Sequence, residues 1–363
     1  MKIKRIVSVI LAVIMLVSVC SVSVFASEGL SMADGLDALQ SQFVGGKGPV
    51  TEGFAIDYSY YSPVKENDTQ KYPLVIWLHG MGDGASAGSQ VTKSQIAYWT
   101  SAEFQSRFEG TGGAFIFAAR SPEERMMFWD DVLIFPLRAA IDSFIAENSD
   151  NIDVTKIYIG GYSMGGKMTL KMAVAYPDMF AAAFPICPAW SPSEEQLELI
   201  ADIPVWLTSG KTDPLINYSS AIMPLWKSIC ESNNSPEMCR LSSLASVRYS
   251  DGNKTSSGHH AWFAVNYDMF SADNGDYPDM TTVNGLGEEV ILTYPNGMIS
   301  WLSQFSSDFD AAPASDSGNI KVENAMPGGA IIEFVKNFFD KIKDFLRKIM
   351  SFFKNLISFG NTQ

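Results

Sequence analysis

Residues 157–166 read Ile-Tyr-Ile-Gly-Gly-Tyr-Ser-Met-Gly-Gly, and this stretch decides the fold. Its β-branched, apolar start predicts a buried strand that runs into a Gly-x-Ser-x-Gly pattern around Ser163. Residues 167–173, which follow, favour a helix. A strand, a sharp turn and a helix form a nucleophile elbow, in which the serine has a strained backbone and an exposed hydroxyl. We expect glycines at positions 161 and 165 because the strand and the helix pass close together there and leave little room for a side chain.

The composition indicates one large buried core. The chain has 363 residues, of which 47% are hydrophobic and 12% aromatic, enough for one large α/β domain with appendages. The net charge of −14 argues against a nucleic acid as partner, because phosphate binding needs a basic face.

The N-terminus has the features of a secretory signal peptide over residues 1–26. A positively charged start precedes an uncharged apolar run over residues 6–19, and small residues permit cleavage after Ala26. We therefore expect a secreted protein. An uncleaved membrane anchor is the alternative, and lipoprotein processing before Cys20 is disfavoured by the bulky Val19.

Three cysteines follow the expected cleavage point. Cys230 and Cys239 are near enough in sequence to close a short loop by a disulfide, which export permits. Cys187 follows a strand-like run and is expected to be a buried free thiol. The chain lacks a Cys-x-x-Cys pair and has three histidines, so we expect no metal site at these cysteines.

Strand-like and helix-like segments alternate along residues 27–305, the expected catalytic domain. Strands are predicted over residues 54–64, 74–78, 114–118, 156–159, 181–186, 205–209 and 245–249. Helices are predicted over residues 94–107, 132–148 and 297–305. This alternation predicts an α/β fold, with a mostly parallel sheet covered by helices on both faces.

A polar insertion interrupts this rhythm over residues 264–296, which are rich in Asp, Asn, Gly and Tyr. A long insertion beside an active site is often a lid or a substrate-contacting loop. Residues 273–276 read Asp-Asn-Gly-Asp but lack the full ligand spacing of a calcium loop, so a plain acidic turn is the better interpretation.

The C-terminal part differs in composition from the domain. Residues 306–329 are rich in Ala, Pro, Ser, Asp and Gly, as in a linker. Residues 330–363 predict an amphipathic helix whose polar face is basic on balance. Such a helix suits a membrane surface or a polyanionic wall; self-association as a coiled coil and docking onto the domain are the alternatives. Its apolar stripe is Ile331, Val335, Phe338, Ile342, Phe345, Ile349, Phe352 and Leu356.

A nucleophilic Ser163 needs a base, an orienting acid and an oxyanion hole. His79 follows an early predicted strand, where a loop supplies an oxyanion N–H, and so fits that loop better than the role of base. The base should follow the acid in the chain. His259 and His260 come after the last predicted strand. Asp213 follows an earlier predicted strand and lies between Ser163 and these histidines in the chain.

Competing assignments exist for each member of this set. Ser163 could be an ordinary turn serine, and Asp213 could cap a turn before Pro214. Asp251 also lies at a predicted strand end, although it precedes the histidine pair closely.

The motifs together resemble the α/β-hydrolase superfamily. Within that group the chain is similar to secreted esterases and predicted peptidases related to feruloyl esterases and polyhydroxyalkanoate depolymerases. The resemblance covers residues 54–305. It rests on Leu-His-Gly-Met-Gly (78–82), Gly-Tyr-Ser-Met-Gly-Gly (161–166), Tyr-Pro-Asp-Met-Phe-Ala-Ala-Ala (176–183), Ser-Gly-Lys-Thr-Asp (209–213) and Gly-His-His-Ala-Trp (258–262).

The resemblance implies a role for each residue. It makes Ser163 the nucleophile, Asp213 the acid and His259 the base, with His259 preferred to His260 by the Gly-His-x-x-Trp pattern. It makes the backbone N–H groups of Met81 and Met164 the oxyanion donors. The fold it implies is the α/β-hydrolase fold, here followed by a C-terminal amphipathic helix.

Two tryptophans are candidates for substrate contact. Trp129 and Trp190 lie in loops expected to border the elbow, where they could stack on a sugar or an aromatic acyl group. Simple packing is the alternative for both.

These features favour a secreted serine hydrolase that cleaves carboxylic esters through an acyl-enzyme. The expected substrate is a small molecule or an acyl group on a polysaccharide, with neither metal nor organic cofactor. A serine peptidase of the prolyl-oligopeptidase type and a non-catalytic surface binding protein on a hydrolase scaffold are the alternatives. The tail predicts contact with a membrane surface or the cell envelope.

Deletion of residues 330–363 should release the protein from anionic vesicles or cells, because the basic amphipathic face would be lost. Co-sedimentation of the full chain and the truncated chain with vesicles measures this. Equal binding of the two chains would contradict envelope contact through the tail.

Overall fold

The computed structural model describes residues 33–93, 96–125, 128–249, 253–255, 257–266, 280–292 and 297–310. The chain divides into two units, Met1–Ala314 and Ser315–Gln363. The predicted signal peptide, Asp251 and the tail helix lie outside the described residues. Among the helices that are described, none combines the length and the apolar character that a membrane crossing requires.

Within the described residues, nine strands form one sheet in the order β1-β2-β4-β3-β5-β6-β7-β8-β9. The pairs from β4 to β8 are parallel, and antiparallel pairs add β1 and β2 at one edge and β9 at the other. This confirms the expected mostly parallel sheet. The strands are β1 (Val44–Lys47), β2 (Asp57–Tyr61), β3 (Tyr72–Leu78), β4 (Phe115–Arg120), β5 (Ile152–Tyr162), β6 (Ala182–Ile186), β7 (Trp206–Gly210), β8 (Arg240–Leu244) and β9 (Met280–Asn284).

Helices and short helical turns connect the strands. The α-helices are α2 (Ala33–Gln40), α3 (Ser89–Thr92), α4 (Ala102–Ser106), α5 (Ile134–Glu147), α6 (Met164–Ala175), α7 (Glu194–Leu199), α8 (Met223–Ser232), α9 (Trp262–Asn266) and α10 (Met298–Leu302). The shorter turns are η1 (Ile96–Thr100), η2 (Glu123–Arg125), η3 (Asp131–Leu133), η4 (Pro177–Met179), η5 (Tyr218–Ile222), η6 (Pro236–Met238) and η7 (Gly258–His260).

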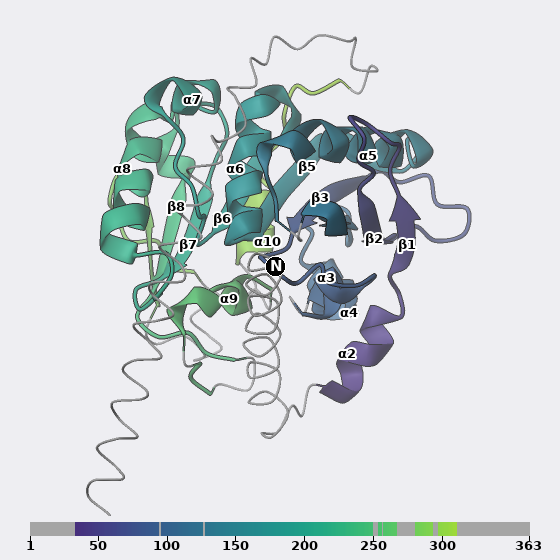
Figure 1. Cartoon of the computed structure of the whole chain (residues 1–363), viewed down its shortest axis with the longest axis horizontal. Helices are drawn as coiled ribbons and strands as arrows, with labels where there is room; N and C mark the ends of the chain where they lie inside the picture. Colours follow the sequence, from purple (N-terminus) through teal and green to yellow (C-terminus); the bar gives the residue numbers. More distant parts are fainter. Residues whose placement is uncertain are drawn as a thin grey trace, which may run out of the picture. The chain divides into compact units, whose positions relative to one another are not determined.

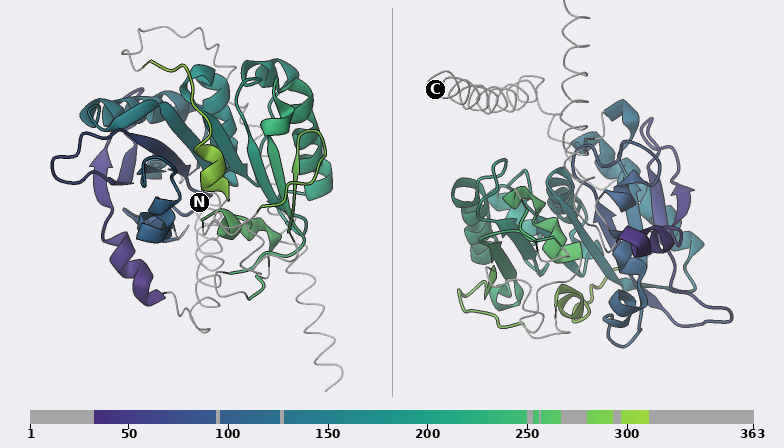
Figure 2. Two further views of the ribbon diagram at one scale, coloured as in Figure 1. Left: turned by 180° about the vertical axis from the view of Figure 1, so that it is seen from behind. Right: turned by 90° about the horizontal axis from the view of Figure 1, so that it is seen from below.

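The central strand β3 shows why both faces of the sheet are covered. All of its residues are buried, as in parallel strands with helices on both sides. Because side chains alternate along a strand, Ile76 joins the core beneath α5, α6 and α8, and Trp77 joins the core beneath α4, α9 and α10. In Figure 1, α6 covers one face, and the view from behind shows α10 over the other (Figure 2).

Three predicted elements differ from the structure. The helix expected over residues 94–107 is two pieces, η1 and α4, because the Ser101 side chain caps a new helix by accepting the N–H of Phe104. The strand expected over residues 245–249 is wrong, since β8 ends at Leu244. The two serines at the centre of β8 break the run of apolar residues by which a buried strand is recognised. Part of the insertion over residues 264–296 forms β9.

Two further findings concern the cysteines and the domain end. The structure contains Cys187, Cys230 and Cys239 as free thiols, so the suggested Cys230–Cys239 disulfide is not formed, while the buried Cys187 is as predicted. Residues 306–310, assigned to the linker, lie against the domain: the N–H of Ser307 donates to the carbonyl of Thr155 at 2.8 Å.

The parallel strands end at one edge of the sheet, where loops gather by the geometry of the fold. At this edge α6 begins directly against the end of β3. A Cβ on Gly165 would lie 2.0 Å from the carbonyl oxygen of Leu78, and one on Gly161 would lie 2.3 Å from the same oxygen. The expected reason for both glycines is therefore confirmed.

Gly165→Ala should destabilise the fold by about 3 kcal/mol, because a backbone carbonyl cannot yield to the added methyl group as a flexible side chain does. Urea unfolding of the variant and the wild type measures the loss. Gly45→Ala is the matched control, since nothing lies within 4 Å of the Cβ it adds. Equal stabilities of the two variants would contradict the close approach.

Candidate active site

Ser163 lies in the sharp turn between β5 and α6. Its backbone has φ 57° and ψ −114°, a conformation that costs a non-glycine residue about 1–3 kcal/mol. Three hydrogen bonds hold it there: its N–H donates to the carbonyl of Ile186 at 2.8 Å, and its carbonyl accepts the N–H groups of Lys167 at 2.9 Å and Ala189 at 3.3 Å. The predicted strand, strained turn and helix are all present.

Asp213 and His259 lie together at the same end of the sheet. Nδ1 of His259 is 2.7 Å from Oδ2 of Asp213, and the Asp213 side chain is fully buried. The other carboxylate oxygen accepts the N–H groups of Leu215 and Ile216 at 2.8 and 3.0 Å. Burial alone would raise the pKa of Asp213, but these hydrogen bonds hold it below its usual value.

An ionised Asp213 fixes the imidazole tautomer. A carboxylate only accepts hydrogen bonds, so Nδ1 of His259 carries the ring proton and Nε2 has a free lone pair. The neighbouring His260 packs its ring against Phe263 and Trp262. It is thus His259 that the structure pairs with the acid.

Glycines let the two loops approach closely enough for this pair. A Cβ on Gly210, at the end of β7, would lie 2.2 Å from the carbonyl oxygen of Gly258. One on Gly258 would lie 2.5 Å from the backbone nitrogen of Asp213. The ring of His259 lies 6.4 Å, centroid to centroid, from that of Tyr162, the residue before Ser163. The serine, the acid and the histidine therefore share one end of the sheet.

His79 begins the loop after β3 and is fully buried. Its Nε2 accepts the N–H of Ser121 at 3.1 Å, so Nδ1 carries the proton and donates to the carbonyl of Gly80 at 2.6 Å. Burial lowers the pKa of His79 to about 4. A neutral histidine with both nitrogens engaged shapes this loop and is not available as a base.

The two expected oxyanion donors flank the elbow in the chain. Met164 is the first residue of α6, and the first N–H groups of a helix have no partner within it. Met81 lies in the turn after His79, where Gly82 has φ 85°. The Met81 side chain is 42% exposed, so it is not a core residue.

The prediction that Trp129 contacts substrate is wrong. Its side chain is fully buried, and its Nε1 donates to the carbonyl of His79 at 3.0 Å. The indole supports the His79 loop from beneath. The sequence gives the loop position but no sign of this hydrogen bond.

Trp190 is only partly buried and stays a candidate for substrate contact. Nζ of Lys171 lies 4.3 Å from the ring centroid, and the same ammonium pairs with Asp131 at 2.9 Å. The ammonium covers part of one ring face by a cation–π contact.

Cys187 completes a group of possible metal ligands. Its Sγ lies within 4.8 Å of ligand atoms of Asp213 and His259. Burial raises the pKa of the thiol well above its usual range, and the Asp213 carboxylate raises it further. A protonated thiol is a poor ligand, and the other two groups already bond each other. The arrangement therefore suits a hydrogen-bonded pair better than an ion.

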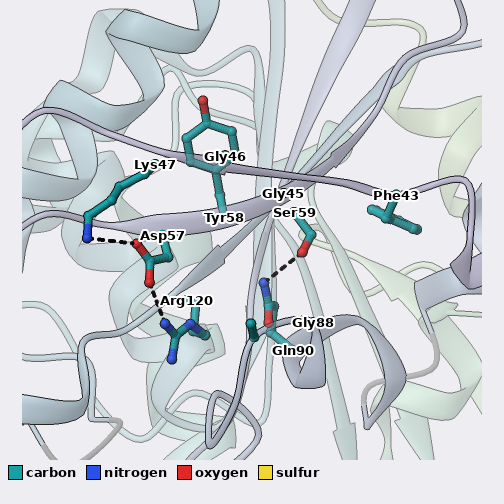
Figure 3. Close-up of a pocket in the computed structure, with 11 residues that line it drawn as sticks. Phe43, Gly45, Gly46, Lys47, Asp57, Tyr58, Ser59, Gly88, Gln90 and Arg120 are labelled. Atoms are coloured by element: carbon teal, nitrogen blue, oxygen red, sulfur yellow. Dashed lines mark hydrogen bonds and ion pairs between the residues drawn. The ribbon is translucent and has the colours of Figure 1, made fainter.

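A separate open cavity of about 650 Å³ lies where β1 and β2 face the start of α3 (Figure 3). Asp57 bridges Lys47 and Arg120 across it. Its lining contains none of Ser163, Asp213 and His259. The chemistry suggested above thus belongs to the sheet end and not to this cavity.

Comparisons with known proteins agree with this architecture. The family described as Phospholipase/Carboxylesterase matches residues 136–245. Dipeptidyl aminopeptidase A of Saccharomyces cerevisiae is 28% identical over 145 residues, which are 38% of this chain and 15% of that protein. The chain therefore spans a small part of this curated relative.

One solved structure shares the fold, and a second is similar over part of the chain. The crystal structure of a thermostable esterase has a TM-score of 0.54 at 23% identity, covering 74% of this chain and 64% of that one. Esterase 2 of Thermogutta terrifontis, a planctomycete, has a TM-score of 0.44 at 14% identity, covering 66% and 97%.

His79 should make stability depend on pH. Its pKa is lower in the folded protein, about 4 against an ordinary 6.5, so its stabilising contribution is present above pH 6.5 and is lost as the pH falls towards 4. The loss should reach about 3 kcal/mol. Urea unfolding at about pH 7 and about pH 4.5 should show a smaller drop for His79→Gln, which does not titrate. Identical drops in both proteins would contradict a buried neutral His79.

Proposed function

We propose that this chain is an α/β hydrolase with a serine nucleophile and that it cleaves carboxylic esters; its fold and the family match over residues 136–245 support this. One observation carries the proposal. A serine in a strained strand-to-helix turn shares the sheet end with a buried, ionised Asp213 that orients His259. That is the arrangement in which a hydroxyl becomes nucleophilic near neutral pH.

In the first half of the reaction, Ser163 Oγ bonds to the ester carbonyl carbon while Nε2 of His259 takes its proton. Negative charge develops on the carbonyl oxygen and is stabilised by the N–H groups of Met81 and Met164, each such donor contributing about 3 kcal/mol in comparable sites. The C–O bond to the alcohol then breaks, and the proton on His259 passes to the leaving alkoxide. The product is an acyl-enzyme.

In the second half, water replaces the alcohol. His259 takes a proton from the water as its oxygen bonds to the acyl carbon, and the same two N–H groups receive the charge. The bond to Ser163 breaks, the serine recovers its proton and the acid leaves. Asp213 stabilises the imidazolium in both halves and remains ionised.

The family match favours an ester as substrate, because its description names phospholipases and carboxylesterases. The relative dipeptidyl aminopeptidase A supports the alternative of a serine peptidase. Both reactions use the same residues, so the leaving group distinguishes them. A non-catalytic binding protein on this scaffold is the third possibility.

For the substrate we propose an ester whose acyl group or alcohol is flat enough to contact Trp190, such as an acyl group on a polysaccharide. The partly exposed indole beside Lys171 supports this. The N-terminal sequence supports action outside the cell, and the basic tail supports contact with the envelope.

Ser163→Ala should abolish labelling by a fluorophosphonate probe and lower ester turnover by about 10⁶-fold. Asp213→Asn should lower turnover by about 10⁴-fold, because the imidazole would adopt the wrong tautomer. Ser193→Ala, at the start of α7, is the matched control and should label like the wild type.

The substrate panel sets acetyl and feruloyl esters against dipeptidyl anilides. Faster turnover of the anilides would favour the peptidase. If the folded wild type is not labelled, the non-catalytic binding protein becomes the favoured alternative.

A further inference from the structure

Tyr162 lies at the meeting point of three loops. It precedes Ser163 and is 8% exposed. Its ring lies 6.4 Å from that of His259, on the loop after β8, and 5.8 Å from that of Trp262, the first residue of α9. It also stacks on Trp77, with the ring centroids 6.2 Å apart. The elbow and the base loop therefore share this one aromatic side chain.

The third loop joins Tyr162 through Asp83. The Tyr162 hydroxyl donates to the Asp83 carboxylate, and Asp83 follows Met81 by two residues. The loop also packs on the ring itself, because a Cβ on Gly80 would lie 2.5 Å from Tyr162. Asp83 is half-buried, and its bond to Tyr162 places its carboxylate where the loop meets the elbow.

Helix α3 and its end hold this loop from another side. Nζ of Lys93 donates to the carbonyl of Gly82 at 3.1 Å, and the Ser89 hydroxyl donates to the carbonyl of Asp83. These bonds fix the loop relative to α3. The bond to Tyr162 fixes it relative to the elbow, which bears the nucleophile.

We propose that the Tyr162–Asp83 hydrogen bond sets the distance between the two oxyanion donors, so that Tyr162 and Asp83 are positioning residues. The inference rests on the proposed function of this site. Met81 lies two residues before Asp83, and Met164 lies two residues after Tyr162. One side-chain bond thus closes a short path between the two donors.

The two donors need this link because they belong to different segments. Met164 is fixed by α6, but Met81 lies in a turn with Gly82 at φ 85°. A misplacement of about 1 Å in such a site costs on the order of 100-fold in rate. Loss of the bond should therefore lower kcat and leave KM little changed.

The charge on Asp83 adds a second signature. Burial raises the pKa of Asp83 to about 6, against the lowering effects of the Tyr162 hydroxyl, the Lys93 ammonium and His259. Above about pH 6 an ionised carboxylate accepts the stronger, charge-assisted bond. Below that pH the neutral acid holds the loop less firmly.

The experiment compares Tyr162→Phe, Asp83→Asn and the double variant in the full chain, with the ester on which the wild type acts. Each single change should lower kcat by about 10- to 100-fold with KM within about threefold. The double variant should be no worse than about twofold below the singles, because all three lose the same charge-assisted bond to an ionised Asp83. The ratio of wild-type to Asp83→Asn kcat should fall towards one below about pH 6.

Tyr72→Phe is the matched control. The Tyr72 hydroxyl also donates to a carboxylate, that of Asp68, but near the start of β3, at the opposite end of that strand. Removing that bond should lower stability and leave kcat within about twofold. Hydrogen exchange at residues 80–84 gives a readout independent of turnover, and it should speed up in Tyr162→Phe but not in Tyr72→Phe.

Unchanged kcat and unchanged exchange in Tyr162→Phe would overturn the inference, as would additive losses in the double variant. A change in KM confined to cationic substrates would also overturn it, by making Asp83 a substrate contact. If the wild type labels and Ser163→Ala does not, these outcomes leave the proposed function standing. If the wild type neither labels nor turns over an ester, the proposed function fails, and the exchange rates still decide the link.

Discussion

The close contact between the start of α6 and the end of β3 is the constraint on which the rest of the site depends. Because Gly165 allows the helix to meet the Leu78 carbonyl directly, the chain must turn sharply at Ser163 and adopt its positive φ. The same contact brings the His79 loop beside the N-terminus of α6. A bulkier residue at either glycine would separate the serine from the loop that is proposed to bind the oxyanion.

Burial favours the neutral form of both ionisable groups that shape the site, but the two groups end with different charges. His79 has no opposite charge beside it among the groups that shift its pKa, so burial keeps it neutral and makes it a rigid spacer. Asp213 is buried too, yet three hydrogen bonds keep it charged. The neutral group holds a loop in place, and the charged one holds the tautomer of His259. The charge of each buried side chain thus depends on whether hydrogen bonds stabilise its ionised form.

Local patterns in the sequence predicted the sheet, the elbow and the chain order of Ser163, Asp213 and His259, because those depend on neighbours in the chain. The failures involve distant contacts. Nothing near Trp129 in the sequence reveals its bond to the His79 carbonyl, so the loop position alone leaves both substrate contact and packing open. β8 was missed because its serines pair across the sheet, where Ser242 bonds Thr282 and Trp206. The meeting of Tyr162 with Asp83 spans 79 positions, beyond any local pattern.

The backbone at Ser163 also bears on how this chain can evolve. A glycine there would relieve the positive φ at no steric cost, so selection for stability alone favours losing the hydroxyl. Selection for turnover is the opposing pressure, since only a side chain at that strained position can attack. A lineage that no longer needs the reaction should drift first at this residue, while the sheet, the glycines and the buried loops around it persist.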